Sequence, residues 1–234
     1  MIIEVFLTSV YIFIWSETMN VSFDHLCALF ALSVAVGLAE ARPVSYPGGI
    51  TLMQNNDADV SSLHLHYSPT ARESIGYRGE YWRAEQWQFH GAQYNRLLKR
   101  WNRPTSQANF YFKGALGWAI SDLDELNNKQ QPAGFVELAA DWEDRRYFVS
   151  YENRYTEAGS IKSAYTQKAR IGFAPYIGDY GDLHTWFMVQ VDHTPTKDDQ
   201  TSVTPLFRFF KNEYLAEIGV NDQGQGLFNL IIRY

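Results

Sequence analysis

His64 and His66 are the two residues in this sequence whose types and spacing most directly suggest metal chemistry. They lie two positions apart, so on an extended strand both imidazoles point to the same side. Imidazoles at that spacing can bind a transition metal, and a neighbouring carboxylate could complete the site. The simpler interpretation is that both rings form hydrogen bonds in a polar interior. We favour it because no cysteine and no further histidine cluster lies nearby, and we expect no cofactor.

Two serine-containing pairs could in principle support hydrolysis. Ser150 and Glu152 share one side of a predicted strand, and Ser68 follows His66 by two residues. A serine nucleophile needs a histidine base and an acidic or amide partner within hydrogen-bond reach. No histidine lies beside Ser150 on its strand, and the sequence contains no Gly-x-Ser-x-Gly motif. The sequence therefore does not predict an enzyme.

A larger set of charged residues recurs at alternate positions, opposite apolar side chains. Six of them are basic and six are acidic. Buried charges must be paired or solvated, so together they predict either an interlocked interior or a narrow wet channel. An equal number of each sign predicts weak ion selectivity. The set comprises Arg78, Glu80, Glu137, Asp141, Glu152, Arg154, Lys168, Arg170, Asp192, Arg208, Glu217 and Arg233.

The elements that must position these residues are β-strands, because the apolar residues recur with a period of two and no segment has helical periodicity. Asn109 to Ile120 is the clearest case: large apolar side chains alternate with polar or small ones. Similar segments give about twelve strands, with eight to fourteen compatible with the pattern. In Trp87–Trp101 the residue Arg96 falls on the apolar side, which indicates a β-bulge. We expect the two longest links, Ser121–Pro132 and Thr194–Gln200, at the same end of the strands.

The last ten residues of the chain, Gln225 to Tyr234, form the most informative strand. One side of it is wholly apolar, and the chain stops on an aromatic residue. This pattern resembles the C-terminal assembly signal of Gram-negative outer-membrane β-barrel proteins. The resemblance implies an antiparallel up-and-down transmembrane β-barrel, with outer-membrane lipid and the barrel assembly machinery as partners. The apolar residues that would form the signal are Phe228, Leu230, Ile232 and Tyr234.

The N-terminal residues 1–41 resemble a leader. Leu26 to Ala39 has the length of a signal-peptide apolar region, and Ala39-Glu40-Ala41 is a small-x-small cleavage site. We expect a signal peptide cleaved after Ala41, with 1–18 an over-extended start before Met19 and a single barrel domain at 42–234. An uncleaved N-terminal anchor is the alternative. The only cysteine, Cys27, lies in this leader, so the mature chain would contain no disulfide.

Composition narrows the functional classes. Four of the 26 acidic residues and none of the 20 basic ones lie in residues 1–41, so the rest is nearly neutral and shows no basic patch for nucleic acid. We therefore expect a small channel-like barrel in the cell outer membrane that passes hydrophilic solutes or ions. The alternatives are a closed structural or adhesive barrel, an outer-membrane lipid or ester hydrolase and, more weakly, metal binding in the lumen. A soluble periplasmic β-sandwich is the competing fold, since its strands would also alternate.

Overall fold

The computed structural model describes residues 43–126, 128–179, 181–196 and 200–234. The expected leader, its cleavage after Ala41 and Cys27 lie outside these residues. No helix in the described part of the chain is long and apolar enough to cross a membrane. The strands are β1 (Ile50–Asn56), β2 (Val60–Thr70), β3 (Glu73–Trp82), β4 (Trp87–Asn102), β5 (Ser106–Ser121), β6 (Gln130–Asp144), β7 (Tyr147–Ala158), β8 (Lys162–Phe173), β9 (His184–Thr194), β10 (Gln200–Lys211), β11 (Tyr214–Val220) and β12 (Gly226–Arg233).

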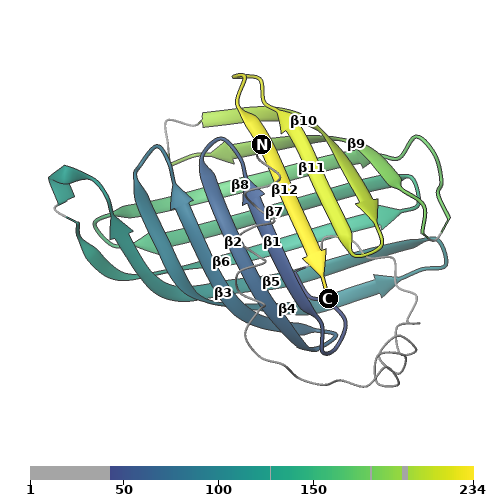
Figure 1. Ribbon diagram of the computed structural model, residues 1–234, viewed down its shortest axis with the longest axis horizontal. Coiled ribbons are helices and arrows are strands. Elements are labelled where there is room, and N and C mark those ends of the chain that lie inside the picture. Colours follow the sequence, from purple (N-terminus) through teal and green to yellow (C-terminus); the bar gives the residue numbers. More distant parts are fainter. Residues whose placement is uncertain (1–42, 127, 180, 197–199) are drawn as a thin grey trace, which may run out of the picture. The chain divides into compact units, whose positions relative to one another are not determined.

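These strands form one closed antiparallel barrel. Each strand pairs with the next along the chain, and β12 pairs with β1 to close the sheet (Figure 1). At this seam the amide of Ile50 donates to the carbonyl of Tyr234 at 2.9 Å, and the amide of Tyr234 donates back at 2.8 Å. The prediction of an up-and-down barrel with about twelve strands is confirmed, and the sandwich alternative is wrong.

Alternation along each strand separates an apolar outer face from a largely polar lumen. On β2 the side chains of Leu65 and Tyr67 are 45% and 47% exposed, whereas His64 and His66 are 2% and 1% exposed. Large apolar residues exposed on every side of a barrel are stable in lipid, and a closed sheet leaves no unpaired strand edge there. Outward-facing examples are Leu63, Ile75, Tyr77, Leu116, Trp118, Val136, Leu138, Val149, Tyr151, Ile171, Phe187, Phe207, Ile218 and Phe228.

The barrel has two ends with different links. We call the end that holds the start of β1 and the end of β12 the turn end, and the opposite end the loop end. The links at the turn end are 71–72, 103–105, 145–146, 174–183 and 212–213, and the other six links between strands lie at the loop end. The longest link, 174–183, lies at the turn end, so the expectation that the two longest links share the loop end is wrong. Pro175 provides a physical reason, because proline has no amide hydrogen to continue a ladder. Arg146 and Arg145 then hold this link through the carbonyls of Pro175 and Gly178, both at 3.0 Å.

The irregular strand β4 contains the expected bulge. Its register with β5 shifts between Leu97 and Lys99, and Arg96 keeps its place on the outer face. A guanidinium nitrogen of Arg96 lies 3.8 Å from Glu73, and the Tyr94 hydroxyl donates to the same carboxylate at 2.7 Å. The outward charge of Arg96 thus has a partner near the turn end of the barrel.

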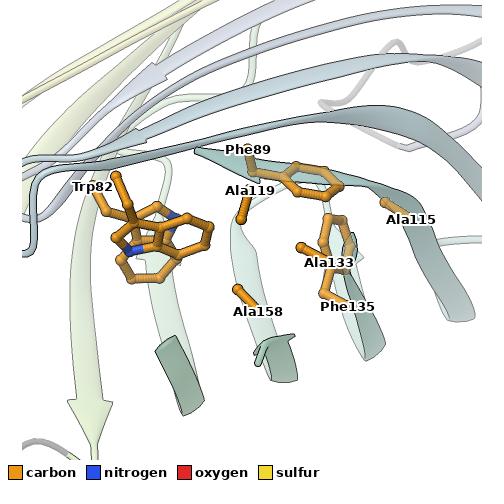
Figure 2. Close-up of a cluster of buried hydrophobic side chains, with 8 residues drawn as sticks. Trp82, Phe89, Ala115, Ala119, Ala133, Phe135 and Ala158 are labelled. Atoms are coloured by element: carbon orange, nitrogen blue, oxygen red, sulfur yellow. The ribbon is translucent and has the colours of Figure 1, made fainter. Parts of the chain in front are cut away.

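Part of the lumen is filled by an inner aromatic cluster, which we define as Trp82, Trp87, Phe89 and Phe135 with the alanines around them. Trp82 and Trp87 stack with ring centroids 5.5 Å apart and an interplanar angle of 11°. Phe89 and Phe135 meet edge to face at 6.1 Å (Figure 2). Aromatic residues of transmembrane barrels commonly collect at the two membrane interfaces. These four instead point inward and pack against Ala115, Ala119, Ala133 and Ala158.

Candidate functional site in the barrel lumen

A cavity of about 280 Å³ lies inside the barrel. Its lining reaches from Pro43 near the turn end to Asn221 and Gln225 at the loop end. The structure places every residue of the predicted charged set on this lining except Arg233, which is inward and buried but not part of the wall. Those on the wall are Arg78, Glu80, Glu137, Asp141, Glu152, Arg154, Lys168, Arg170, Asp192, Arg208 and Glu217.

Glu80 on β3 holds two arginines and joins strands that are not neighbours in the sheet. Its Oε1 lies 2.7 Å from Nη2 of Arg78. Arg154 on β7 donates from Nη1 to Oε1 at 2.7 Å and from Nη2 to Oε2 at 2.8 Å. Trp82 donates its indole N–H to Oε2 at 3.2 Å, and the Arg154 guanidinium lies 3.6 Å from the Phe135 ring centroid. This bidentate bridge fixes the charged lumen to the inner aromatic cluster.

Lys113 on β5 forms a second group with two carboxylates. Its Nζ lies 2.6 Å from Glu137, which is its cross-strand partner on β6, and 3.4 Å from Glu152 on β7. Lys113 was missing from the predicted charged set. The signal was present in the sequence, because Lys113 shares the parity of Asn109 and Tyr111, which the alternation already placed inside.

Glu217 on β11 forms a third group that resembles the first. Arg208 donates from Nε to Oε1 at 2.7 Å, and Arg170 donates from Nη1 to the same oxygen at 3.1 Å. Asn229 donates to Oε2 at 2.6 Å, and Arg170 also donates from Nε to the Gln190 side-chain carbonyl at 2.6 Å. Both carboxylate oxygens are therefore occupied, which stabilises a buried charge.

Lys168 on β8 is the centre of a more open group. Its Nζ lies 3.6 Å from Asp192 on β9 and 3.9 Å from Asp57 on the other side of the barrel. About 30% of each of these three side chains is exposed, in contrast to 0% for Glu80 and 3% for Glu217. Asp57 was not predicted because it lies in the link 57–59, where alternation gives no direction. Asp59 from the same link also lines the cavity.

The two histidines contact each other but gain no further metal ligand. Their ring centroids are 4.4 Å apart. Across the described residues, no three His, Cys, Asp or Glu side chains are grouped so that they could hold a metal ion. His64 is paired across strands with Arg78, whose positive charge disfavours a metal cation nearby. The geometry thus offers a metal two imidazoles at most.

His66 and Ser68 do not form the hydrogen bond that a serine hydrolase would need. Neither ring nitrogen of His66 has a hydrogen-bond partner among the described residues, so the expectation that both imidazoles form hydrogen bonds in the interior is wrong for His66. The Ser68 hydroxyl instead accepts from the amide of Ser45 at 3.0 Å. In this chain segment, the carbonyl of Pro43 accepts from the Ser74 hydroxyl at 2.7 Å and from the Asn95 amide at 3.3 Å. The segment before β1 therefore lines the turn end of the lumen.

The apolar side of β12 faces away from the lumen. Phe228 and Tyr234 are 48% and 64% exposed, while Ile231 and Arg233 are buried inside. These residues lie on the seam that closes the barrel. A closed strand order and an apolar outer face are together the features of a barrel that crosses lipid. The chain has the fold of a transmembrane β-barrel.

Comparison with known proteins gives likeness in structure only. No family model matches the barrel, and no curated protein matches its sequence. The KdgM porin is similar with a TM-score of 0.46 and 8% identity, over 80% of this chain and 98% of that one. The translocator domain of autotransporter NalP from Neisseria meningitidis has a TM-score of 0.45 and 8% identity, over 79% and 85%. OccK8 (OprE) from Pseudomonas aeruginosa has a TM-score of 0.40 and 7% identity, over 75% and 57%.

Proposed function

We propose that this outer-membrane β-barrel is a small channel that passes hydrophilic solutes or ions and performs no catalysis. The observation that carries the proposal is the cavity, which is lined mostly by charged and polar side chains and reaches from Pro43 to the loop end. A lining of this kind favours water and ions over an apolar ligand. Its volume of about 280 Å³ corresponds to about nine water molecules. The channel is therefore narrow, and we expect a small conductance.

A closed structural barrel is the second candidate, and specific contacts favour it. The bridge between Glu80 and Arg154 crosses the interior, and Lys162 at the start of β8 lies 3.0 Å from Glu85 in the link between β3 and β4. These ion pairs connect parts of the wall that are not neighbours in the sheet, and they therefore narrow the lumen. They do not fill it, because the cavity continues beside Asp57, Lys168 and Asp192.

Conductance of the purified, refolded barrel in planar lipid bilayers tests this proposal. We expect discrete openings whose size changes when Arg170 or Glu137 is neutralised, because both side chains line the cavity. The matched control is Glu125→Gln, which changes the charge of an exposed residue in the link between β5 and β6. Absence of conductance at every voltage and salt concentration would favour the closed barrel, and release of fatty acid from lipid would favour a hydrolase.

A further inference from the structure

The four arginines of the cavity wall are held by two carboxylates. Arg78 and Arg154 share Glu80, and their side chains are 15% and 12% exposed. Arg170 and Arg208 share Glu217, and theirs are 15% and 5% exposed. Each group keeps one surplus positive charge, but the guanidiniums that carry it have little contact with the open lumen.

The rest of the cavity wall has the opposite balance. Outside the two arginine groups, its basic residues are Lys113 and Lys168 only. Six carboxylates and two lysines leave four negative charges there. The two arginine groups together supply two positive charges, so the wall as a whole is acidic. These carboxylates belong to Asp57, Asp59, Glu137, Asp141, Glu152 and Asp192.

Among the ion-paired side chains of the cavity wall, those most accessible to water are also mainly acidic. The side chain of Glu152 is 38% exposed, that of Asp57 30% and that of Asp192 29%. Lys168, at 31%, is the base among them, whereas Lys113 is only 13% exposed. Asp57 and Asp192 approach Lys168 from different sides of the barrel. A solute in this part of the lumen therefore meets three carboxylates and one ammonium group.

A narrow lumen makes this imbalance effective. Mobile ions screen charges over a Debye length of about 8 Å at physiological salt, whereas a cavity of about 280 Å³ leaves no room for such a screening layer. Low-dielectric walls of one prevailing sign also focus the field and concentrate ions of the opposite sign. We infer that the lumen favours small cations over anions and that Asp57, Asp192 and Lys168 set this preference. The inference rests on the proposed channel function.

Reversal potentials of single channels under a potassium chloride gradient test the inference. Wild-type barrel should show a cation-selective reversal potential. The double substitution Asp57→Asn and Asp192→Asn should move it towards zero or beyond. One unit charge about 10 Å away in water changes the concentration of a monovalent ion about twofold, so two charges give about fourfold. Lys168→Gln should move the potential in the opposite direction, by about half as much.

The substitutions preserve the local hydrogen bonds. Asp57 accepts from the amides of Asp59 and Val60 at 3.0 and 2.8 Å, and Asp192 accepts from the Gln190 side chain at 2.5 Å. An asparagine oxygen can accept the same bonds, and heat-modifiable migration in detergent gels verifies that each variant folds. Asp124→Asn is the matched control, since Asp124 is exposed in the link 122–129 and does not line the cavity.

The outcomes separate this inference from the proposed function. A conducting wild-type barrel with a zero or anion-selective reversal potential would overturn the cation preference and leave the channel intact. Cation selectivity that is unchanged in the double variant, or equally changed in Asp124→Asn, would overturn the assignment to Asp57 and Asp192. A barrel that folds and never conducts would overturn both proposals.

Discussion

The lumen contains two regions that have the same sequence pattern but different physical character. On β3 to β6 the inner aromatic cluster packs like a protein core, with Trp87 at 0% and Phe89 at 1% exposure. On β8 and β9, with the link after β1, the side chains of Lys168, Asp192 and Asp57 remain partly exposed. Except for Asp57 in the link 57–59, both regions consist of inward residues on strands whose side chains alternate between the two faces. Alternation therefore determines which side chains face the lumen, but not whether they exclude water there.

The largest expected effect on stability comes from removing a packed side chain in the inner aromatic cluster. Trp87→Ala removes a fully buried ring that stacks on Trp82, so we expect it to lower the free energy of unfolding by about 4 kcal/mol. Urea titration in lipid vesicles, followed by the gel shift between folded and unfolded barrel, measures this change. The control is Trp118→Ala, which removes the same side chain from the outer face, where Trp118 is 57% exposed. Equal losses would contradict a packed core inside the barrel.

The next effect concerns the bridge between Glu80 and Arg154, which joins β3 to β7 beside the inner aromatic cluster. Glu80→Gln leaves Arg78 and Arg154 without their shared carboxylate, and breaking a buried ion pair costs about 3 kcal/mol. The same urea titration measures it, with Glu125→Gln on an exposed link as the control for the loss of one carboxylate. If Glu80→Gln were as stable as the control, the bridge would not hold β3 and β7 together.

The smallest effect on stability is expected in the partly exposed region around Lys168, Asp192 and Asp57. Lys168→Gln removes partly exposed ion pairs at 3.6 and 3.9 Å, which contribute less than about 1 kcal/mol each. We therefore expect almost unchanged stability in urea, although the reversal potential shifts. A loss as large as that of Glu80→Gln would mean that Lys168 is part of a packed interior, and the contrast between the two regions would disappear.

The sequence was sufficient for the class of fold, the direction of most side chains and the seam strand. It predicted that His64 and His66 share one side and face a polar interior, because a period of two depends only on the strand itself. It could not predict that Glu80 meets Arg154, which is 74 residues away, since that contact depends on the register of every strand between them. Nor could it place Asp57, because a link residue has no fixed direction.

Other differences have equally local reasons. Alternation along Asn109 to Ile120 is sufficient to place Lys113 inside, whereas its ion pair with Glu137 depends on the register of β5 with β6. The inner aromatic cluster was not predicted because Trp82 and Trp87 lie on different strands on either side of the link 83–86. A composition rule assigns such rings to the membrane interfaces. Only the antiparallel pairing of Trp82 with Trp87 shows that they stack inside.

The seam between β1 and β12 has a consequence for how the barrel is made. All other strand pairs are hairpins between consecutive segments, whereas the Asn56 side chain bonds to the carbonyl of Phe228, 172 residues further along the chain. Until β12 has been synthesised, every partial sheet keeps two edges of unpaired amides and carbonyls, each of which costs several kcal/mol in hydrocarbon. We therefore expect the strands not to enter lipid one at a time in order of translation, and insertion and closure to occur together once β12 has been synthesised.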